Sequence, residues 1–73
     1  MKNTYWTSPV GGFDDFDFPI TDKIIDGKTT QGPWAIMTPE SHQIYGVGLG
    51  IGLGQVYEKQ ADGKWLMTKG GDQ

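Results

Sequence analysis

The fold is decided by the stretch Thr38-Pro39-Glu40-Ser41-His42-Gln43-Ile44-Tyr45-Gly46, because it carries the start and stop signals of a short helix. Thr38 can accept the first free backbone N–H groups as the N-cap residue, and Pro39 suits the first helical position. Glu40 complements the positive end of the helix dipole, and Gly46 fits a left-handed position after the last turn. The stretch therefore predicts a helix of about two turns.

Strand-forming residues and turn signals lie on both sides of this helix. Before it, the sequence Lys23-Ile24-Ile25-Asp26-Gly27-Lys28-Thr29-Thr30 predicts a β-hairpin that turns at Asp26-Gly27. After it, Ala61-Asp62-Gly63 separates the strand-like stretches 55–60 and 64–68, which predicts a second hairpin. The order hairpin, helix, hairpin predicts a small α+β fold.

The chain has 73 residues, which predicts a single small domain over residues 1–73 with residues 1–19 as an N-terminal arm that can move. A chain of this size buries little surface, and small domains commonly add a disulfide or a metal. The absence of cysteine excludes a disulfide, which leaves aromatic packing or oligomerisation, and three Trp, three Tyr and three Phe can supply a small core.

The net charge is −3, and all six basic residues are lysine. This balance is the opposite of the basic surface with which proteins neutralise nucleic-acid phosphates, so it disfavours nucleic-acid binding. The N-terminus lacks the pattern of a signal peptide, and no stretch approaches the roughly 18 apolar residues of a membrane span. We therefore expect a cytoplasmic protein that has no membrane contact.

Aromatic and acidic residues alternate near the N-terminus, at Phe13, Asp14, Asp15, Phe16, Asp17 and Phe18. Three Phe side chains are poorly suited to water, while the acids between them resist burial. One interpretation is a docking arm, whose aromatics enter pockets of a partner protein and whose acids meet a basic rim. The alternative is that Phe16 or Phe18 packs on the domain's own hairpin while Asp14 and Asp15 are solvated.

Glycine alternates with aliphatic residues from Gly46 to Gly54. The spacing does not match a nucleotide-binding glycine loop, and it predicts an extended strand with apolar side chains on one face. The bare glycine face then needs a cover. An aromatic of this chain can supply that cover, as can a partner, and pairing of this strand between copies would give a homo-oligomer.

No set of residues has the spacing of an active site. His42 is the only histidine, so it has no second imidazole with which to share a metal. Ser41 and His42 are adjacent on the predicted helix and cannot face each other, so the serine lacks a base. We therefore expect no enzymatic activity, no metal and no cofactor.

Two pentapeptides resemble metal-binding motifs whose cysteines have been replaced: Ser8-Pro9-Val10-Gly11-Gly12 and Thr38-Pro39-Glu40-Ser41-His42. In treble-clef zinc fingers a C-P-x-C-G knuckle precedes a hairpin, and a second cysteine pair lies on the first turn of a helix. The resemblance places the four former ligand positions at Ser8, Gly11, Thr38 and Ser41. It implies a treble-clef-like fold without zinc, since these residues hold Zn²⁺ poorly.

Residues 24 to 60 also resemble small proteins of phages and mobile elements, with the pattern G-P-W-A-x-M-C-x-x-C-H followed by G-V-G-L-G-x-G-x-G-Q. Gly32-Pro33-Trp34-Ala35 and the Gly46 to Gly54 run carry this resemblance. It brings no biochemical function with it, but it implies an accessory protein that acts by binding another protein. The alternatives are a nucleic-acid-binding relative of treble clefs and a structural protein that self-associates.

Overall fold

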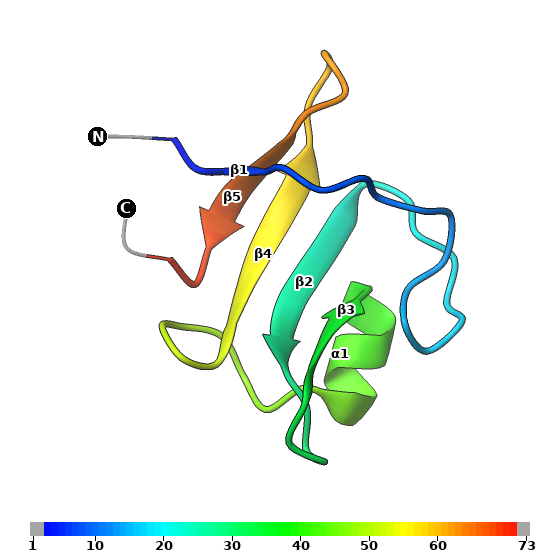
Figure 1. The fold of residues 1–73 in the computed structure, drawn as a ribbon, viewed down its shortest axis with the longest axis vertical. Coiled ribbons are helices and arrows are strands. Elements are labelled where there is room, and N and C mark those ends of the chain that lie inside the picture. Colours follow the sequence, from blue (N-terminus) through cyan, green and yellow to red (C-terminus); the bar gives the residue numbers. More distant parts are fainter. Residues whose placement is uncertain (1–2, 72–73) are drawn as a thin grey trace.

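The computed structural model describes residues 3–71, so the two ends of the predicted domain, residues 1–2 and 72–73, lie outside the described residues. Five strands form one antiparallel sheet in the order β1-β5-β4-β2-β3, and one helix packs beside it (Figure 1). The α+β fold class is confirmed. The elements are β1 Tyr5–Trp6, β2 Lys23–Lys28, β3 Trp34–Met37, α1 Pro39–Tyr45, β4 Gly54–Lys59 and β5 Trp65–Lys69.

The predicted helix is confirmed with its N-cap. The Thr38 hydroxyl accepts a 3.2 Å hydrogen bond from the Ser41 N–H, and the Thr38 N–H donates a 3.0 Å bond to the Ser41 hydroxyl, so the two residues form a capping box. The left-handed conformation expected at Gly46 is wrong, because its φ is −80° and its ψ is 157°. A glycine stands there for another reason: the His42 ring lies so close that a Cβ would collide with it.

The turn predicted at Asp26-Gly27 is also wrong. Both residues lie inside β2, where they pair with Ile36 and Ala35 of β3. The chain turns at residues 29–33 instead, where the Thr29 N–H and hydroxyl donate to the Pro33 carbonyl at 3.0 and 2.7 Å.

Packing explains why Gly27 stays in the strand. It faces Gly54 of β4, and a Cβ on Gly27 would lie 3.1 Å from the Leu53 carbonyl oxygen and 3.3 Å from the Cα of Gly54. Close approach of two strands, rather than a turn, is therefore what requires glycine at this position.

The second hairpin is confirmed. β4 and β5 pair antiparallel, with a bulge between Val56 and Tyr57. Their turn is closed by a 2.7 Å hydrogen bond from the Gln60 N–H to the Lys64 carbonyl, and Gly63 adopts a φ of 86° within it. Asp-Gly therefore acts as a turn signal in this hairpin although it does not in the first.

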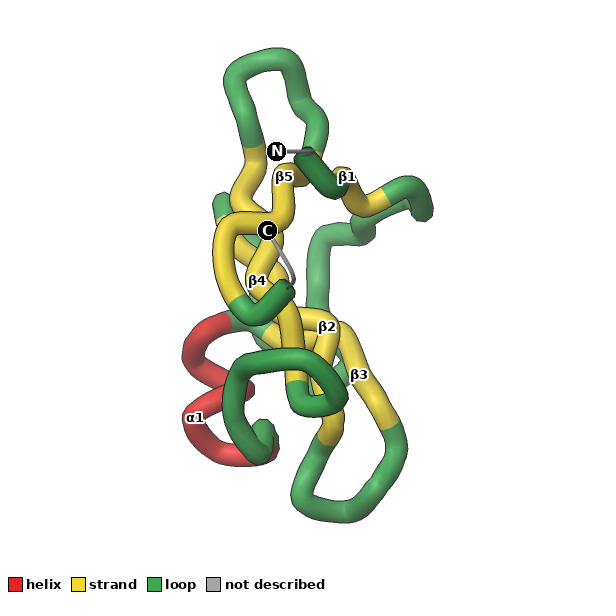
Figure 2. Tube along the Cα trace, turned by 90° about the vertical axis from the view of Figure 1, so that its left-hand side faces the viewer, coloured by secondary structure: helices red, strands yellow, loops and turns green. Residues whose placement is uncertain are grey.

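The sheet carries a small core on each face. Helix α1 lies on one side and β1 on the other (Figure 2). On the helix side Ile25, Met37 and Val56 are buried, with Phe16, Ala35 and Tyr45 against them. On the opposite side Ile24, Tyr57 and Trp65 are buried, with Trp6, Val10, Ile20, Ile36 and Met67 against them.

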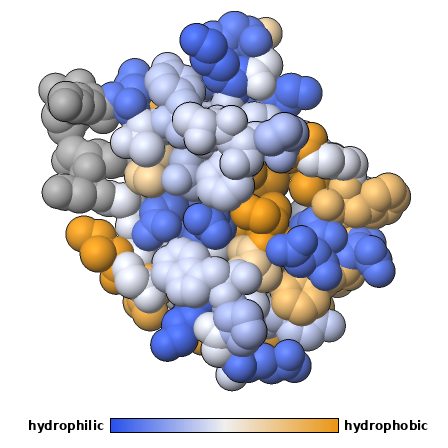
Figure 3. Space-filling view, viewed as in Figure 1, coloured by the Kyte–Doolittle hydropathy of each residue, from blue (hydrophilic) through white to orange (hydrophobic). Residues whose placement is uncertain are grey.

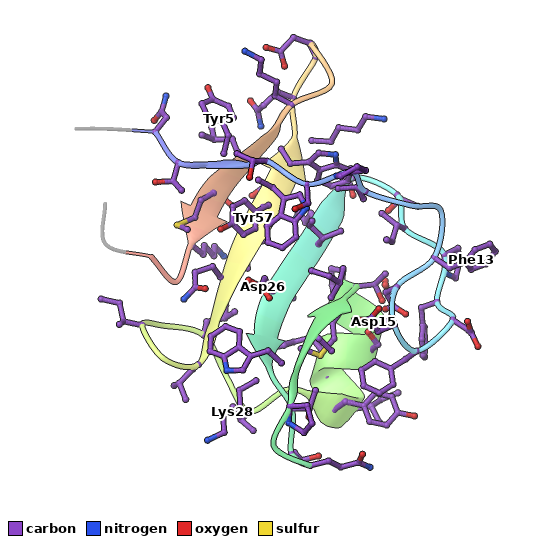
Figure 4. The ribbon with its side chains drawn as sticks, in the orientation of Figure 1. Tyr5, Phe13, Asp15, Asp26, Lys28 and Tyr57 are labelled. Atoms are coloured by element: carbon purple, nitrogen blue, oxygen red, sulfur yellow. The ribbon has the colours of Figure 1, made fainter. Side chains whose placement is uncertain are left out.

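Asp26 and Tyr57 project from the same face of the sheet, on neighbouring strands (Figure 4). Burial raises the pKa of the Asp26 carboxyl. The pKa of the Tyr57 phenol is raised as well, by its burial and by the negative charge of Asp26. This half-buried carboxylate therefore favours its neutral form more than a solvated one does.

The segment Gly46–Gly54, called the glycine loop below, is not the predicted strand. Gly48, Gly50 and Gly52 have φ angles of 145°, 129° and 81°, which turn the chain repeatedly. Its end closes as a tight turn, in which Gly50 and Gly54 exchange N–H to carbonyl hydrogen bonds of 2.9 and 3.0 Å. Because this segment is a loop and not a strand, the structure does not support the predicted pairing of two copies along a strand at Gly46–Gly54.

Candidate functional site

Asp14 of the acidic and aromatic segment is buried, with 5% of its surface exposed. One carboxylate oxygen accepts 2.9 Å hydrogen bonds from the N–H groups of Phe16 and Phe18. The other accepts from the Thr38 N–H at 2.8 Å and from the Ser41 hydroxyl at 2.5 Å. The interpretation of Asp14 as a solvated acid is therefore wrong.

These donors explain how a carboxylate can be buried here. Burial raises the pKa of Asp14, but the Ser41 hydroxyl and the N–H groups of Phe18, Thr38 and Phe16 lower it by more, so the pKa lies below its usual value. Asp14 is thus a charged acceptor that joins the N-terminal segment to the start of the helix.

Asp15 is exposed, but it is bonded to the sheet edge. Its N–H donates to the Ile36 carbonyl at 3.0 Å, and its carboxylate accepts from the Ile36 N–H at 2.8 Å. Ile36 lies on β3, the outermost strand of the sheet on that side. Asp15 therefore satisfies backbone groups that an edge strand otherwise offers to another chain.

The three Phe side chains of the segment have different surroundings. Phe16 stacks on Tyr45 of α1, with ring centroids 4.0 Å apart and planes 10° apart. Phe18 is half-buried, whereas Phe13 keeps 66% of its surface exposed at the outer edge of the molecule (Figure 4). Phe16 therefore packs within its own domain, as one of the two interpretations expected, against the β2–β3 hairpin residues Ile25 and Met37 as well as on the helix.

The remaining acid, Asp17, is exposed and has a φ of 66°. Phe13, Asp15 and Asp17 are thus the members of the predicted docking arm whose side chains reach solvent. The structure brings Asp14 and Phe16 to the helix instead. Two of the four donors that hold Asp14 are the nearby N–H groups of Phe16 and Phe18, and the other two come from residues 24 and 27 positions later, which the local sequence does not reveal.

The four positions aligned with zinc ligands differ in their surroundings. Thr38 and Ser41 bind each other and Asp14. Ser8 and Gly11 instead line a hollow beside Trp6 and Lys59. Within residues 3–71 there is no group of three or more His, Cys, Asp or Glu side chains placed to hold a metal ion.

The glycine loop presents apolar side chains that sequence reasoning did not expect to find in solvent. Ile51 is 78% exposed, and Val47, Leu49 and Leu53 are each about 40% exposed. Ile44, at the end of α1, is also exposed, at 59%. Hydrophobic atoms of the loop show at the left edge of Figure 3, below the grey residues. The aliphatic members of the loop are Val47, Leu49, Ile51 and Leu53.

A hollow of about 160 Å³ adjoins this surface on the helix side of the sheet. Ile25 and Val56 of neighbouring strands line it together with Leu49 of the loop. Lys23 and Lys69 also line it, so charged groups flank an apolar hollow. Alternation of glycine with aliphatic residues is the sequence signal of this loop, and it also fits a one-sided strand.

Ser41 and His42 do not form a catalytic pair. The Ser41 hydroxyl is buried against Asp14, while Nε2 of His42 lies 3.1 Å from the Gly48 carbonyl oxygen and so holds the glycine loop.

None of the residues that the structure describes belongs to a helix long and apolar enough to cross a bilayer. No protein-family model, curated protein or solved structure matches the chain.

Proposed function

We propose that this chain is a non-catalytic protein-binding domain whose main contact surface is the glycine loop. The observation that supports the proposal is the exposure of Val47, Leu49, Ile51 and Leu53 on one nine-residue segment. A chain with a thin core gains from burying such side chains itself, so their exposure requires a reason. Contiguous exposed apolar residues are typical of surfaces that bind other proteins.

The loop is held in place before any partner arrives. The Lys28 N–H donates to the Leu53 carbonyl at 2.8 Å, and the Gln55 side-chain amide donates to the Gly50 carbonyl at 3.1 Å. Together with the contact of His42 on Gly48, these bonds fix the loop on β2, β4 and α1. A surface fixed in this way loses little conformational entropy on binding.

The N-terminal segment supplies a second, smaller contact in this proposal. Phe13 provides an exposed aromatic anchor, and Asp15 and Asp17 provide acidic groups near it. The partner would then be a protein with a basic patch beside an apolar pocket. Asp14 and Phe16 support this segment from within and do not take part in the contact.

The resemblance of residues 24 to 60 to proteins of phages and mobile elements supports an origin in such an element. We propose an accessory protein of such an element, acting in the cytoplasm on a host or viral protein. A net charge of −3 without arginine argues against the alternative of nucleic-acid binding. Self-association is the other alternative, through the same exposed aliphatic side chains.

Affinity capture with three forms of the chain tests the proposal. The wild type is compared with the Leu49→Ser, Ile51→Ser double variant and with Phe13→Ser, which removes an exposed aromatic outside the loop. We expect a captured partner to bind the wild type and be lost from the loop variant, with Phe13→Ser weakened less. Equal binding by the loop variant would refute the glycine loop as the contact surface.

Light scattering after size exclusion separates the alternatives. A monomeric wild type at high concentration excludes self-association, whereas a dimer that the loop variant abolishes favours it over a foreign partner. A gel-shift assay at low salt, where electrostatic binding is strongest, tests nucleic acid.

A further inference from the structure

A second hollow lies at the other end of the sheet from the glycine loop and has a volume of about 640 Å³. Its lining comes partly from the segment that follows β1, blue in Figure 1, and partly from the turn that joins β4 to β5, orange in Figure 1. The volume is within the range of about 300–1,000 Å³ typical of small-molecule sites. The lining residues are Trp6, Ser8, Pro9, Val10, Gly11, Ile20, Thr21, Lys59, Gly63, Lys64 and Trp65.

The walls are fixed by strand pairing and backbone hydrogen bonds. Trp6 pairs with Trp65 across β1 and β5, and the Trp6 ring meets Tyr57 edge-on with centroids 5.4 Å apart. The Lys59 N–H donates to the Asp22 carbonyl at 2.9 Å, which ties the end of β4 to the segment before β2. The part of the lining that lies on β1, β4 and β5 is therefore set by the folded sheet.

The charge of the lining is opposite to that of the chain. Lys59 and Lys64 contribute two ammonium groups, and no Asp or Glu is among the lining residues, although the whole chain has a net charge of −3. Nζ of Lys64 lies 5.8 Å from the ring centroid of Tyr5, which keeps that ammonium group beside β1. The hollow concentrates positive charge in an acidic protein, and this attracts anions.

The rest of the lining adds two further kinds of contact. Ser8 supplies a hydroxyl group that can donate to an oxyanion, whereas the Thr21 hydroxyl donates to the Asp22 carboxylate at 3.2 Å. Trp6, Val10 and Ile20 supply a half-buried apolar wall. A ligand that uses all of these groups needs an anionic head and an apolar or aromatic body.

We propose that this hollow binds a small organic anion, in which a phosphate or carboxylate group contacts Lys59 and Lys64 and an aromatic or apolar body packs against Trp6. Lysine binds phosphate as a point charge, and the Ser8 hydroxyl adds a directional bond. This site is separate from the protein contact of the glycine loop. In this proposal Ser8 and Gly11, which align with the zinc knuckle, are part of the anion site.

Four probe molecules test the site on the full chain: phenyl phosphate, benzoate, inorganic phosphate and the neutral phenyl β-glucoside. Binding is followed by tryptophan fluorescence and by NMR shifts of the Trp indole N–H groups. We expect phenyl phosphate or benzoate to bind at least tenfold more tightly than inorganic phosphate, and the glucoside not to bind. The stronger of the two anions identifies the head group.

Variants assign the binding to this hollow. The Lys59→Gln, Lys64→Gln double variant should weaken the aromatic anion at least tenfold, whereas Lys23→Gln, which alters a lysine that does not line this hollow, should leave the affinity within twofold. Both lysine side chains are exposed, so the double variant should unfold at the same temperature as the wild type. Unchanged affinity of the double variant, or no response of the wild type to any anion at millimolar concentration, would overturn the proposal.

Discussion

The Ser41 hydroxyl donates a 2.5 Å hydrogen bond to the Asp14 carboxylate, across 27 positions of sequence. Thr38, the N-cap of α1, donates to the same carboxylate oxygen through its N–H group at 2.8 Å. One buried side chain thereby holds the N-terminal segment, the end of β3 and the first turn of the helix together. The stability of the domain should depend on this joint more than on any other polar contact described above.

Asp14→Asn should lower the free energy of unfolding by about 2–3 kcal/mol, the usual worth of hydrogen bonds to a charged group. The amide keeps one acceptor oxygen but turns an NH₂ group toward N–H or O–H donors. Chemical denaturation measures the change. Asp17→Asn is the matched control, since Asp17 is exposed and asparagine tolerates its positive φ. Equal stability of Asp14→Asn and wild type would show that the joint is not needed.

Thr38→Ala should cost about 1 kcal/mol, because it removes the hydroxyl that caps the helix. Thr38→Ser keeps that hydroxyl and should retain most of the stability. Thermal unfolding followed by circular dichroism compares the two variants. If serine were as damaging as alanine, the methyl group of Thr38 would be the important part rather than the cap.

The carboxyl groups of Asp14 and Asp26 should make the stability of the fold depend on pH in opposite directions. The folded-state pKa of Asp14 lies below its model-compound value of 3.8, so its contribution is present above that pH and is lost as the pH falls through the folded pKa. The folded-state pKa of Asp26 lies above 3.8, so the folded chain takes up a proton first and gains stability as the pH falls toward 3.8.

Melting temperatures measured from pH 7 to pH 2 test these two opposite pH dependences. Asp26→Asn should melt above the wild type at pH 7, and this difference should shrink as the wild-type carboxyl becomes protonated. Asp14→Asn should melt below the wild type at pH 7, and this deficit should shrink in acid. A deficit of Asp14→Asn that grew in acid would contradict the assignment.

Gly54→Ala should cost about 1–3 kcal/mol through overpacking. A Cβ on Gly54 would lie 3.0 Å from the Gly48 carbonyl oxygen and 3.3 Å from the Cα of Gly27, and both neighbours are backbone atoms that cannot move aside. Gly12→Ala is the control, because no atom lies within 4 Å of a Cβ there. Denaturant midpoints measured in parallel should separate the two variants clearly.

Local signals were sufficient for part of the fold. The N-cap at Thr38 and the Asp62-Gly63 turn act through neighbouring backbone groups, and both are confirmed. The Asp26-Gly27 turn failed because Gly27 is needed where β2 approaches Gly54, which is a contact between distant segments. The dipeptide Asp-Gly alone does not show whether its glycine is needed for a turn or for the close approach of another strand.

The candidate sites were harder to predict for the same physical reason. The burial of Asp14 depends in part on Thr38 and Ser41, which donate to one of its oxygens, and the local pattern of phenylalanine and aspartate does not reveal these distant partners. The alternation in the glycine loop fits a strand until Gly48, Gly50 and Gly52 are seen at positive φ. The hollow at Lys59 joins segments from both halves of the sequence, so no single stretch indicated it.

Pairing of Trp6 with Trp65 has a consequence for the order of folding. The joint of Asp14 with Ser41 uses residues up to position 41, so its members are synthesised well before β5. The wall that Trp65 contributes is added only with β5, and until then β1 lacks the strand with which it pairs. Any ligand of that hollow would therefore recognise only chains that already contain β5, and a chain terminated before Trp65 should bind nothing there.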